Sequence, residues 1–208
     1  MKIESYKTEK LKVEKDLNEM TKKSDLISWI RVALFILIMG LLSYGYFKKI
    51  DIFYAFVAVL TIIFFLIVKL HSDIELKIKY KKSKIQVYQK YIKRLNGTWY
   101  DFKDKGTEYL DENMPYLKDL DIFGEGSLYQ YICSANTIYG KKSLVKHLKQ
   151  NDYNLDYIIK HQEAVKELSN MQDFANEIET LSYLTKENKK KNINKEIKKF
   201  IEVCEDKT

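Results

Sequence analysis

The glycines and the serine at residues 124–127 most directly raise the question of chemistry. They read Gly124-Glu125-Gly126-Ser127 within the stretch DLDIFGEGSLYQYI of residues 119–132. A phosphate-binding loop needs G-x-x-x-x-G-K-[ST] after a strand, and no lysine stands at the required place here. A capped helix explains the same residues, because Ser127 is a favourable N-cap and Gln130 completes a capping box. The glycines would then give the backbone freedom before the helix, so the stretch predicts no nucleotide site.

Cysteine and histidine, the usual ligands of transition metals, are few and scattered. Cys133 and Cys204 belong to no C-x-x-C pair, so they support neither a disulfide framework nor a zinc site. His71, His147 and His161 are also scattered along the sequence, which favours surface or half-buried histidines over metal ligands. The sequence also contains no Walker A motif and no candidate general acid, base or nucleophile. We therefore expect no catalytic residue, metal site, cofactor or enzyme activity in this chain.

Basic residues outnumber acidic ones, with 36 Lys and Arg against 29 Asp and Glu and a net charge of +7. This balance indicates an anionic neighbour, either nucleic acid or the negative cytoplasmic leaflet, although a lysine-rich composition can also reflect an AT-rich genome. The candidate anion contacts are Lys189, Lys190, Lys191, Lys195, Lys198 and Lys199. These lysines could bind nucleic acid in a salt-sensitive way. They could instead form a solvated helix face or contact anionic lipid, and we favour these two interpretations over nucleic-acid binding.

Two apolar runs of about twenty residues, 26–47 and 52–70, match the length needed to cross a hydrocarbon core of about 30 Å. Arg31 is the only charge well inside the first run, about one turn from its start, where its side chain can reach the interface. A signal peptide would have a shorter apolar run and no second span, and a soluble hairpin would not be apolar all round. Residues 26–70 are therefore predicted to form a transmembrane hairpin.

The residues on either side of this hairpin predict its orientation and a helical stalk. Basic residues are more numerous on the flanks of the hairpin than in the connection 48–51, whose Lys48 and Lys49 weaken this contrast without reversing it. The positive-inside rule therefore places both termini on the cytoplasmic side of the cell membrane. Residues 1–25 and 71–96 carry apolar residues with the 3.5-residue period of a coiled coil. These arms are expected to pair antiparallel, and only modestly, because Lys10 and Lys81 interrupt the stripes.

The rest of the chain reads as a connecting segment, 97–118, and an all-α module, 119–208. A helix after Ser127 is predicted to bury one apolar face and to stop at Gly140. That face consists of Leu128, Tyr131, Ile132 and Ala135. Further helices are predicted from four apolar stripes: Leu144, Val145 and Leu148; Ile158, Val165 and Leu168, from a start near Asn154; Met171, Phe174, Ile178, Leu181 and Leu184; and Ile193, Ile197, Phe200, Ile201 and Cys204.

The order of motifs in this module resembles the start of the MutS core domain. DLDIFGEGSLYQYI, the turn TIYG, the helix KKSLVKHL and the helix IIKHQEAVKEL follow the order of that family's segments. The residues that fit are Leu120, Phe123, Gly126, Ser127, Leu128, Thr137, Gly140, Leu144, Leu148, Ile158, Gln162, Ala164, Val165 and Leu168. The connecting segment is similar to the membrane-anchored MutS-related branch, which carries paired spans ahead of the core. Its Met114 departs from the histidine usual there. The likeness covers residues 97–185, and the spans only by architecture.

This resemblance implies a DNA-binding ATPase family, whose members add a mismatch-reading domain, a DNA clamp and a C-terminal ATPase that also dimerises. Phe123-Gly124-Glu125 matches the family's Phe-x-Glu motif, but it lies in the entrance to the core, where the family does not read DNA, so we take the match as accidental. The 208 residues contain no clamp and no ATPase. ATP, Mg²⁺, DNA and a homodimer are therefore implied only for full-length relatives.

Three functions compete on these grounds. The chain could be the membrane-anchoring N-terminal part of a MutS-related ATPase, tethering and scaffolding an ATP-dependent DNA clamp. It could be a stand-alone membrane-bound helical adaptor for protein–protein interaction, which binds no DNA. It could also bind nucleic acid directly through its C-terminal lysines.

Overall fold

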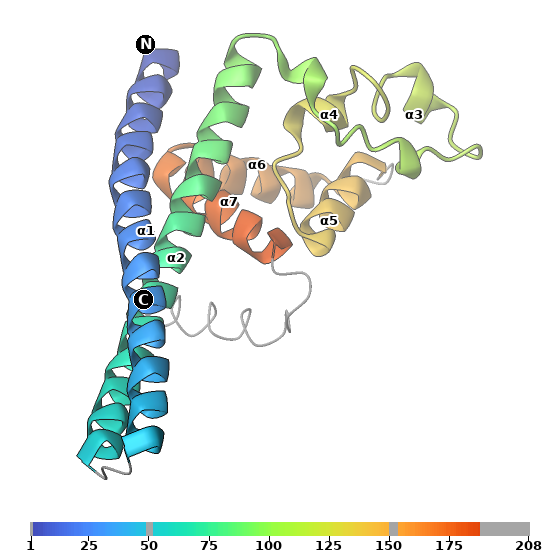
Figure 1. Cartoon of the computed structure of the whole chain (residues 1–208). Coiled ribbons are helices and arrows are strands. Elements are labelled where there is room, and N and C mark those ends of the chain that lie inside the picture. The colour runs from blue at the N-terminus through green and yellow to red at the C-terminus, as the bar shows by residue number, and fades with distance from the viewer. Residues whose placement is uncertain (1, 49–51, 150–153, 188–208) are drawn as a thin grey trace. The chain divides into compact units, whose positions relative to one another are not determined.

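The computed structural model describes residues 2–48, 52–149 and 154–187, and every regular element in these ranges is a helix (Figure 1). Two long helices, α1 (Lys2–Lys48) and α2 (Ile52–Leu95), come first. The shorter elements are η1 (Trp99–Asp101), η2 (Thr107–Tyr109), α3 (Tyr116–Asp119), α4 (Leu128–Ile132), α5 (Ile138–Lys149), α6 (Leu155–Ser169) and α7 (Gln172–Glu187). The predicted all-α class is confirmed. The long helices contain no proline, the residue that most strongly breaks a helix.

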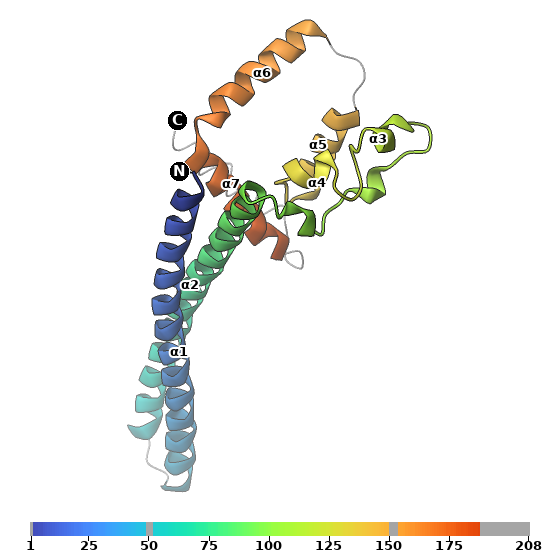
Figure 2. The ribbon, with the colours of Figure 1, turned by 90° about the horizontal axis from the view of Figure 1, so that it is seen from above.

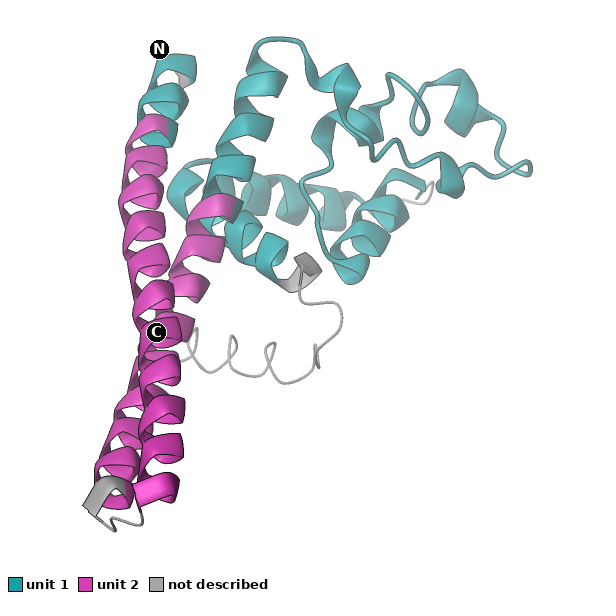
Figure 3. Ribbon diagram, in the orientation of Figure 1, with its two compact units in different colours: residues 1–10, 83–208 teal, residues 11–82 magenta. Residues whose placement is uncertain are grey.

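The chain forms two compact units (Figure 3). Residues 11–82 make up one, which we call the hairpin unit, and residues 1–10 with 83–208 make up the other, the helical unit. Each long helix belongs partly to both units. The units are described separately below.

In the hairpin unit, α1 and α2 lie side by side in opposite directions (Figure 2). Phe35 faces Phe64 across the pair, with ring centroids 6.4 Å apart. Lys81, which was expected to weaken the pairing, forms an ion pair with Asp16 at 2.9 Å. Because the Asp16 side chain is 60% exposed, this ion pair contributes little stability.

A polar contact also joins the two helices of the hairpin unit. The His71 imidazole lies 3.2 Å from Ser24 Oγ through Nε2 and 3.2 Å from Arg31 Nη1 through Nδ1. A guanidinium can only donate hydrogen bonds, so Nδ1 must accept and the ring must be neutral, with its proton on Nε2. Nε2–H then donates to Ser24. Arg31, predicted to lie near the membrane interface, thus has a defined partner on the other helix.

In the helical unit, the first turns of α1 pack against the end of α2. The Tyr6 ring stacks on Tyr91, with centroids 5.2 Å apart, and also contacts Tyr88 at 5.8 Å. This arrangement is consistent with the antiparallel pairing expected of the two arms. α2 ends where predicted, because Gly97 adopts a left-handed φ of 74° and the Thr98 amide donates to the Lys93 carbonyl.

The core of the helical unit lies between η2, α4 and α5. Leu117, Phe123, Tyr129 and Cys133 are buried together, and the predicted stripe of α5 packs partly against them through Leu144, Val145 and Leu148. Gly106 makes this packing close. A Cβ at this position would lie 2.6 Å from Tyr129 Cδ1, and its φ of 64° also disfavours other residues.

Two expectations about the α4 region are wrong. α4 is only five residues long and buries Tyr129 and Gln130, whereas Leu128, Tyr131 and Ile132 are each about 40% exposed. One turn of helix cannot present an i, i+7 face, so the partners of the neighbouring loops decide what is buried. Gly140 does not stop this helix either. It lies in the first turn of α5, where its amide donates to Thr137 Oγ1 at 3.1 Å.

The predicted helices α6 and α7 are present, and α6 begins as expected with Asn154 as its N-cap, whose side chain accepts from the Asp156 amide. Their apolar stripes, however, are largely exposed. Val165 and Leu168 of α6 and Phe174 and Ile178 of α7 are all more than 40% exposed, whereas Ile158, Leu181 and Leu184 are half-buried. The last predicted stripe, Ile193 to Cys204, lies outside the described residues.

Candidate functional site

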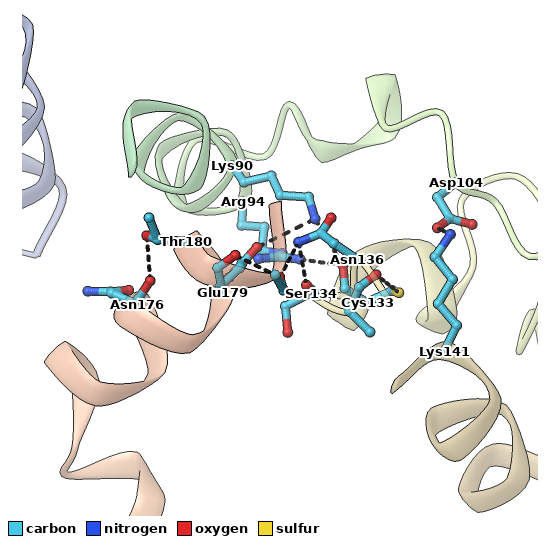
Figure 4. A network of polar contacts seen from close by, with 12 residues as sticks. Lys90, Arg94, Asp104, Cys133, Ser134, Asn136, Lys141, Asn176, Glu179 and Thr180 are labelled. Carbon is cyan, nitrogen blue, oxygen red and sulfur yellow. Dashed lines mark hydrogen bonds and ion pairs between the residues drawn. The ribbon is translucent and has the colours of Figure 1, made fainter. Parts of the chain in front are cut away.

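Buried polar side chains connect α2, α7 and the segment between α4 and α5 in the helical unit (Figure 4). Lys90 of α2 lies 3.5 Å from Glu179 Oε1 of α7, and the Glu179 side chain is only 4% exposed. Arg94, one turn after Lys90, donates to the Tyr131 carbonyl at 2.8 Å and to the Cys133 carbonyl at 2.9 Å. We call this group the polar network.

Burial acts against both charges of the Lys90–Glu179 pair. Removal from water raises the pKa of the Glu179 carboxyl, against the opposing effect of Lys90 and Arg94. Removal from water also lowers the pKa of the Lys90 amine, although Glu179 opposes that shift. The Lys90 amine is 5.6 Å from the centre of the Tyr183 ring, a further contact that favours its charged form.

α7 buries a polar face, which is the reverse of the usual pattern for a surface helix. Asn176, Glu179 and Thr180 are buried, and the Thr180 hydroxyl donates to the Asn176 carbonyl at 2.7 Å. One turn later, Ser182 Oγ accepts a hydrogen bond of 2.9 Å from Asn136 Nδ2. The Thr180 bond stays within α7, whereas the Asn136–Ser182 and Lys90–Glu179 contacts reach other segments and so fix the rotation of α7 about its own axis.

Gln130 organises the loop that precedes the network. The backbone N–H of Gln130 donates to Ser127 Oγ, which confirms Ser127 as the N-cap of α4. Its side chain does not return to the Ser127 amide, as a capping box would require. Instead Gln130 Oε1 accepts from the Gly126 amide at 2.8 Å, and Nε2 donates to the carbonyls of Tyr100 and Phe102. A single side chain therefore joins η1 to α4.

A cavity of about 260 Å³ lies beside the polar network. Lys90, Cys133, Asn136 and Tyr183 contribute to its walls. It also borders Asp101 and Asp104, and both carboxylates are paired, Asp101 with Lys93 at 3.3 Å and Asp104 with Lys141. Within the described residues, no three His, Cys, Asp or Glu side chains converge on a metal position. The contacts of the network join α2, α7 and the α4–α5 segment.

The residues singled out by the MutS resemblance are only partly brought together. Phe123, Ser127 and Leu144 lie in or against the core around α4, where Gly126 has a left-handed φ of 73°. The exposed ones are Leu120, Leu128, Thr137, Gln162, Ala164, Val165 and Leu168, and the half-buried ones include Gly140, Leu148 and Ile158. The candidate anion contacts Lys189, Lys190, Lys191, Lys195, Lys198 and Lys199 lie outside the described residues.

Sequence reasoning missed the polar network and one cluster of rings. Lys90 and Arg94 read only as charges of an amphipathic arm, and nothing in their spacing indicates a partner on α7. His147 and His161, treated as scattered, lie with ring centroids 5.3 Å apart, next to Tyr157. The 13 residues that separate the two histidines along the chain gave no signal of this contact. Comparisons with family models, with curated proteins and with solved structures find no match to this chain.

Proposed function

We propose that this chain is the membrane-anchoring N-terminal part of a MutS-related DNA-binding ATPase, which tethers and scaffolds an ATP-dependent DNA clamp. The observation that carries the proposal is the continuity of α2. In this single helix, an apolar stretch of membrane-spanning length precedes the residues that hold the polar network together. α2 thus contributes residues to both the hairpin unit and the helical unit.

The exposure of the two apolar stretches supports a membrane environment. Only 6% of the most apolar window of α1 and 11% of that of α2 is buried within the protein. A core helix of a soluble protein would be largely buried, and in our proposal the hydrocarbon core of the membrane covers these side chains instead. Trp29 and Tyr46, 74% and 75% exposed, lie toward the two ends of the first apolar run, where aromatic side chains favour the interface.

The outward apolar faces of α6 and α7 support the scaffolding part of the proposal. Leu155 and Ile159 add to this surface, with exposures of 70% and 46%. In a MutS-like core, further helices of the same protein would cover such a surface. ATP, Mg²⁺, DNA and dimer contacts would belong to domains beyond this chain, so the role of the chain is mechanical rather than catalytic.

The size of the protein in its own membranes tests this proposal. We would extract the native protein with detergent and measure its intact mass. A species several hundred residues longer than 208 supports the tethered ATPase, and ATP-dependent DNA binding by that species is the next measurement. A species near 24.8 kDa contradicts it. The exposed faces of α6 and α7 would then favour the alternative, a membrane-bound helical adaptor that binds another protein and no DNA.

A further inference from the structure

His147, Tyr157 and His161 form a ring cluster between α5 and α6. The ring centroids of His147 and His161 are 5.3 Å apart with an interplanar angle of 19°. Tyr157 lies 5.8 Å from His161 and 6.5 Å from His147. Tyr157 and His161 are one turn apart on α6 and exposed, and His147 of α5 is half-buried. Solvent therefore reaches the cluster.

The hydrogen bonds of His147 determine which of its nitrogens is available. Nδ1 lies 2.7 Å from the Ser143 carbonyl, which can only accept, so Nδ1 carries a proton. In the neutral ring, Nε2 then has a free electron pair and accepts a hydrogen bond of 2.8 Å from the Tyr157 hydroxyl. Metal-binding histidines commonly have this arrangement, because a backbone carbonyl bonded to one nitrogen orients the other toward the metal.

We propose that His147 Nε2 and a ring nitrogen of His161 bind a divalent transition-metal ion of the Zn²⁺ class. Two imidazoles on one tetrahedral zinc, with Zn–N bonds of about 2.1 Å, have ring centres about 5 Å apart. The observed separation of 5.3 Å between the ring centroids of His147 and His161 is close to this value. Water fills the remaining positions, and the ion replaces the Tyr157 hydroxyl as the partner of Nε2.

The bound ion joins two helices that have few other direct connections. Every residue of α6 except the half-buried Ile158 is exposed, and Asp156 pairs only with Lys160 of the same helix among the ion pairs of the described residues. A metal held by one ligand from α5 and one from α6 fixes their relative position. His147 and His161 lie within the segments KKSLVKHL and IIKHQEAVKEL, but neither is among the residues that carry the MutS resemblance. The site also lies outside the polar network, so it does not depend on the proposed function.

Zn²⁺ titration of the full chain tests the site. We would use untagged protein in detergent micelles, with Cys133→Ser and Cys204→Ser to remove competing thiols, and measure affinity by calorimetry. His147→Gln and His161→Gln are each expected to weaken binding at least tenfold. His71→Gln removes the third histidine and leaves the affinity unchanged. The absorption spectrum of bound Co²⁺ reports tetrahedral geometry in the parent protein and loses intensity in the two variants.

Two results would overturn the proposal. One is the absence of Zn²⁺ binding at millimolar ion, which would mean that the three rings only pack together. The other is binding that survives both substitutions, which would place the ion elsewhere. Far-UV circular dichroism of each variant checks that helix content is unchanged, so a loss of binding reports the ligands rather than unfolding.

Discussion

At the residue scale, the Lys90–Glu179 contact illustrates how burial changes the meaning of an ion pair. Both partners have pKa values shifted by burial toward their neutral forms, so the attraction between them does not fully offset the loss of water. Arg94, by contrast, is bonded to two carbonyls and has its own partners. The pair therefore specifies how α7 docks on α2 more than it stabilises the contact.

This interpretation predicts a particular double-mutant cycle. Glu179→Leu alone should lower the free energy of unfolding by about 3 kcal/mol, because the Lys90 amine is left buried without its carboxylate. Adding Lys90→Met should recover most of that loss, since two apolar side chains replace two buried charges. Urea unfolding of the full chain in detergent, followed by near-UV circular dichroism, measures both. A double variant less stable than Glu179→Leu would contradict the interpretation.

Two tyrosines near the network predict an alkaline instability. Burial raises the pKa of both Tyr91 and Tyr183 to about 12, above the ordinary value of 10.0. The folded state keeps these protons after the unfolded state has lost them, so the free energy of unfolding decreases as pH rises from about 10 to about 12. Below pH 10 this contribution is constant. Tyr91→Phe and Tyr183→Phe should each reduce the slope, and an unchanged slope in the double variant would refute the assignment.

At the element scale, two glycines with the same backbone conformation allow the energetic cost of backbone strain to be distinguished from the cost of a steric clash in the core. Gly97 and Gly106 both have left-handed φ values, 74° and 64°, but only Gly106 faces a neighbour at a distance forbidden to Cβ. Gly97→Ala should therefore lower the free energy of unfolding by about 1 kcal/mol, because only the backbone conformation is disfavoured. Gly106→Ala should cost at least about 2 kcal/mol more, because Tyr129 and Phe123 must move. Equal losses of thermal stability would show that the core around Tyr129 can adjust.

The hairpin unit offers a second prediction at this scale. His71→Leu removes the partner of Ser24 and Arg31, and Arg31 Nε is already buried without a hydrogen bond. We expect a loss of about 1–3 kcal/mol in hairpin stability, because the Arg31 guanidinium loses its acceptor and Ser24 Oγ loses its donor. Heat-induced loss of helix in detergent measures it. Ser72→Leu, at an exposed neighbouring position, is the matched control and should leave the transition unchanged.

At the scale of the whole molecule, the proposed topology predicts which positions react from outside the cell. In a background of Cys133→Ser and Cys204→Ser, a cysteine at Phe47 lies at the predicted external end of the first span, and one at Leu11 lies on the cytoplasmic arm. Both side chains are exposed, by 79% and 65%. A membrane-impermeant maleimide should label Phe47→Cys in intact cells and Leu11→Cys only after permeabilisation. The opposite labelling pattern would invert the orientation.

The sequence alone determined the helical class, the two long apolar helices and several of the boundaries. Apolar runs, the N-caps Ser127 and Asn154 and the end of α2 at Gly97 depend on neighbouring residues, which the sequence places together. The prediction for α4 was wrong because its single turn is governed by Gln130, whose partners lie about thirty residues earlier.

Only the tertiary structure decided which face of each short helix is buried and which polar groups meet. α7 has an apolar stripe that predicts one buried face, yet it buries Asn176, Glu179 and Thr180, because Lys90 of α2 and Asn136 of the α4–α5 segment supply partners there. The same holds for His147 and His161, which meet across two helices. A helix can be predicted from the sequence because the residues that start, continue and end it are neighbours along the chain. A buried contact depends on groups that come within reach of each other only when the chain folds.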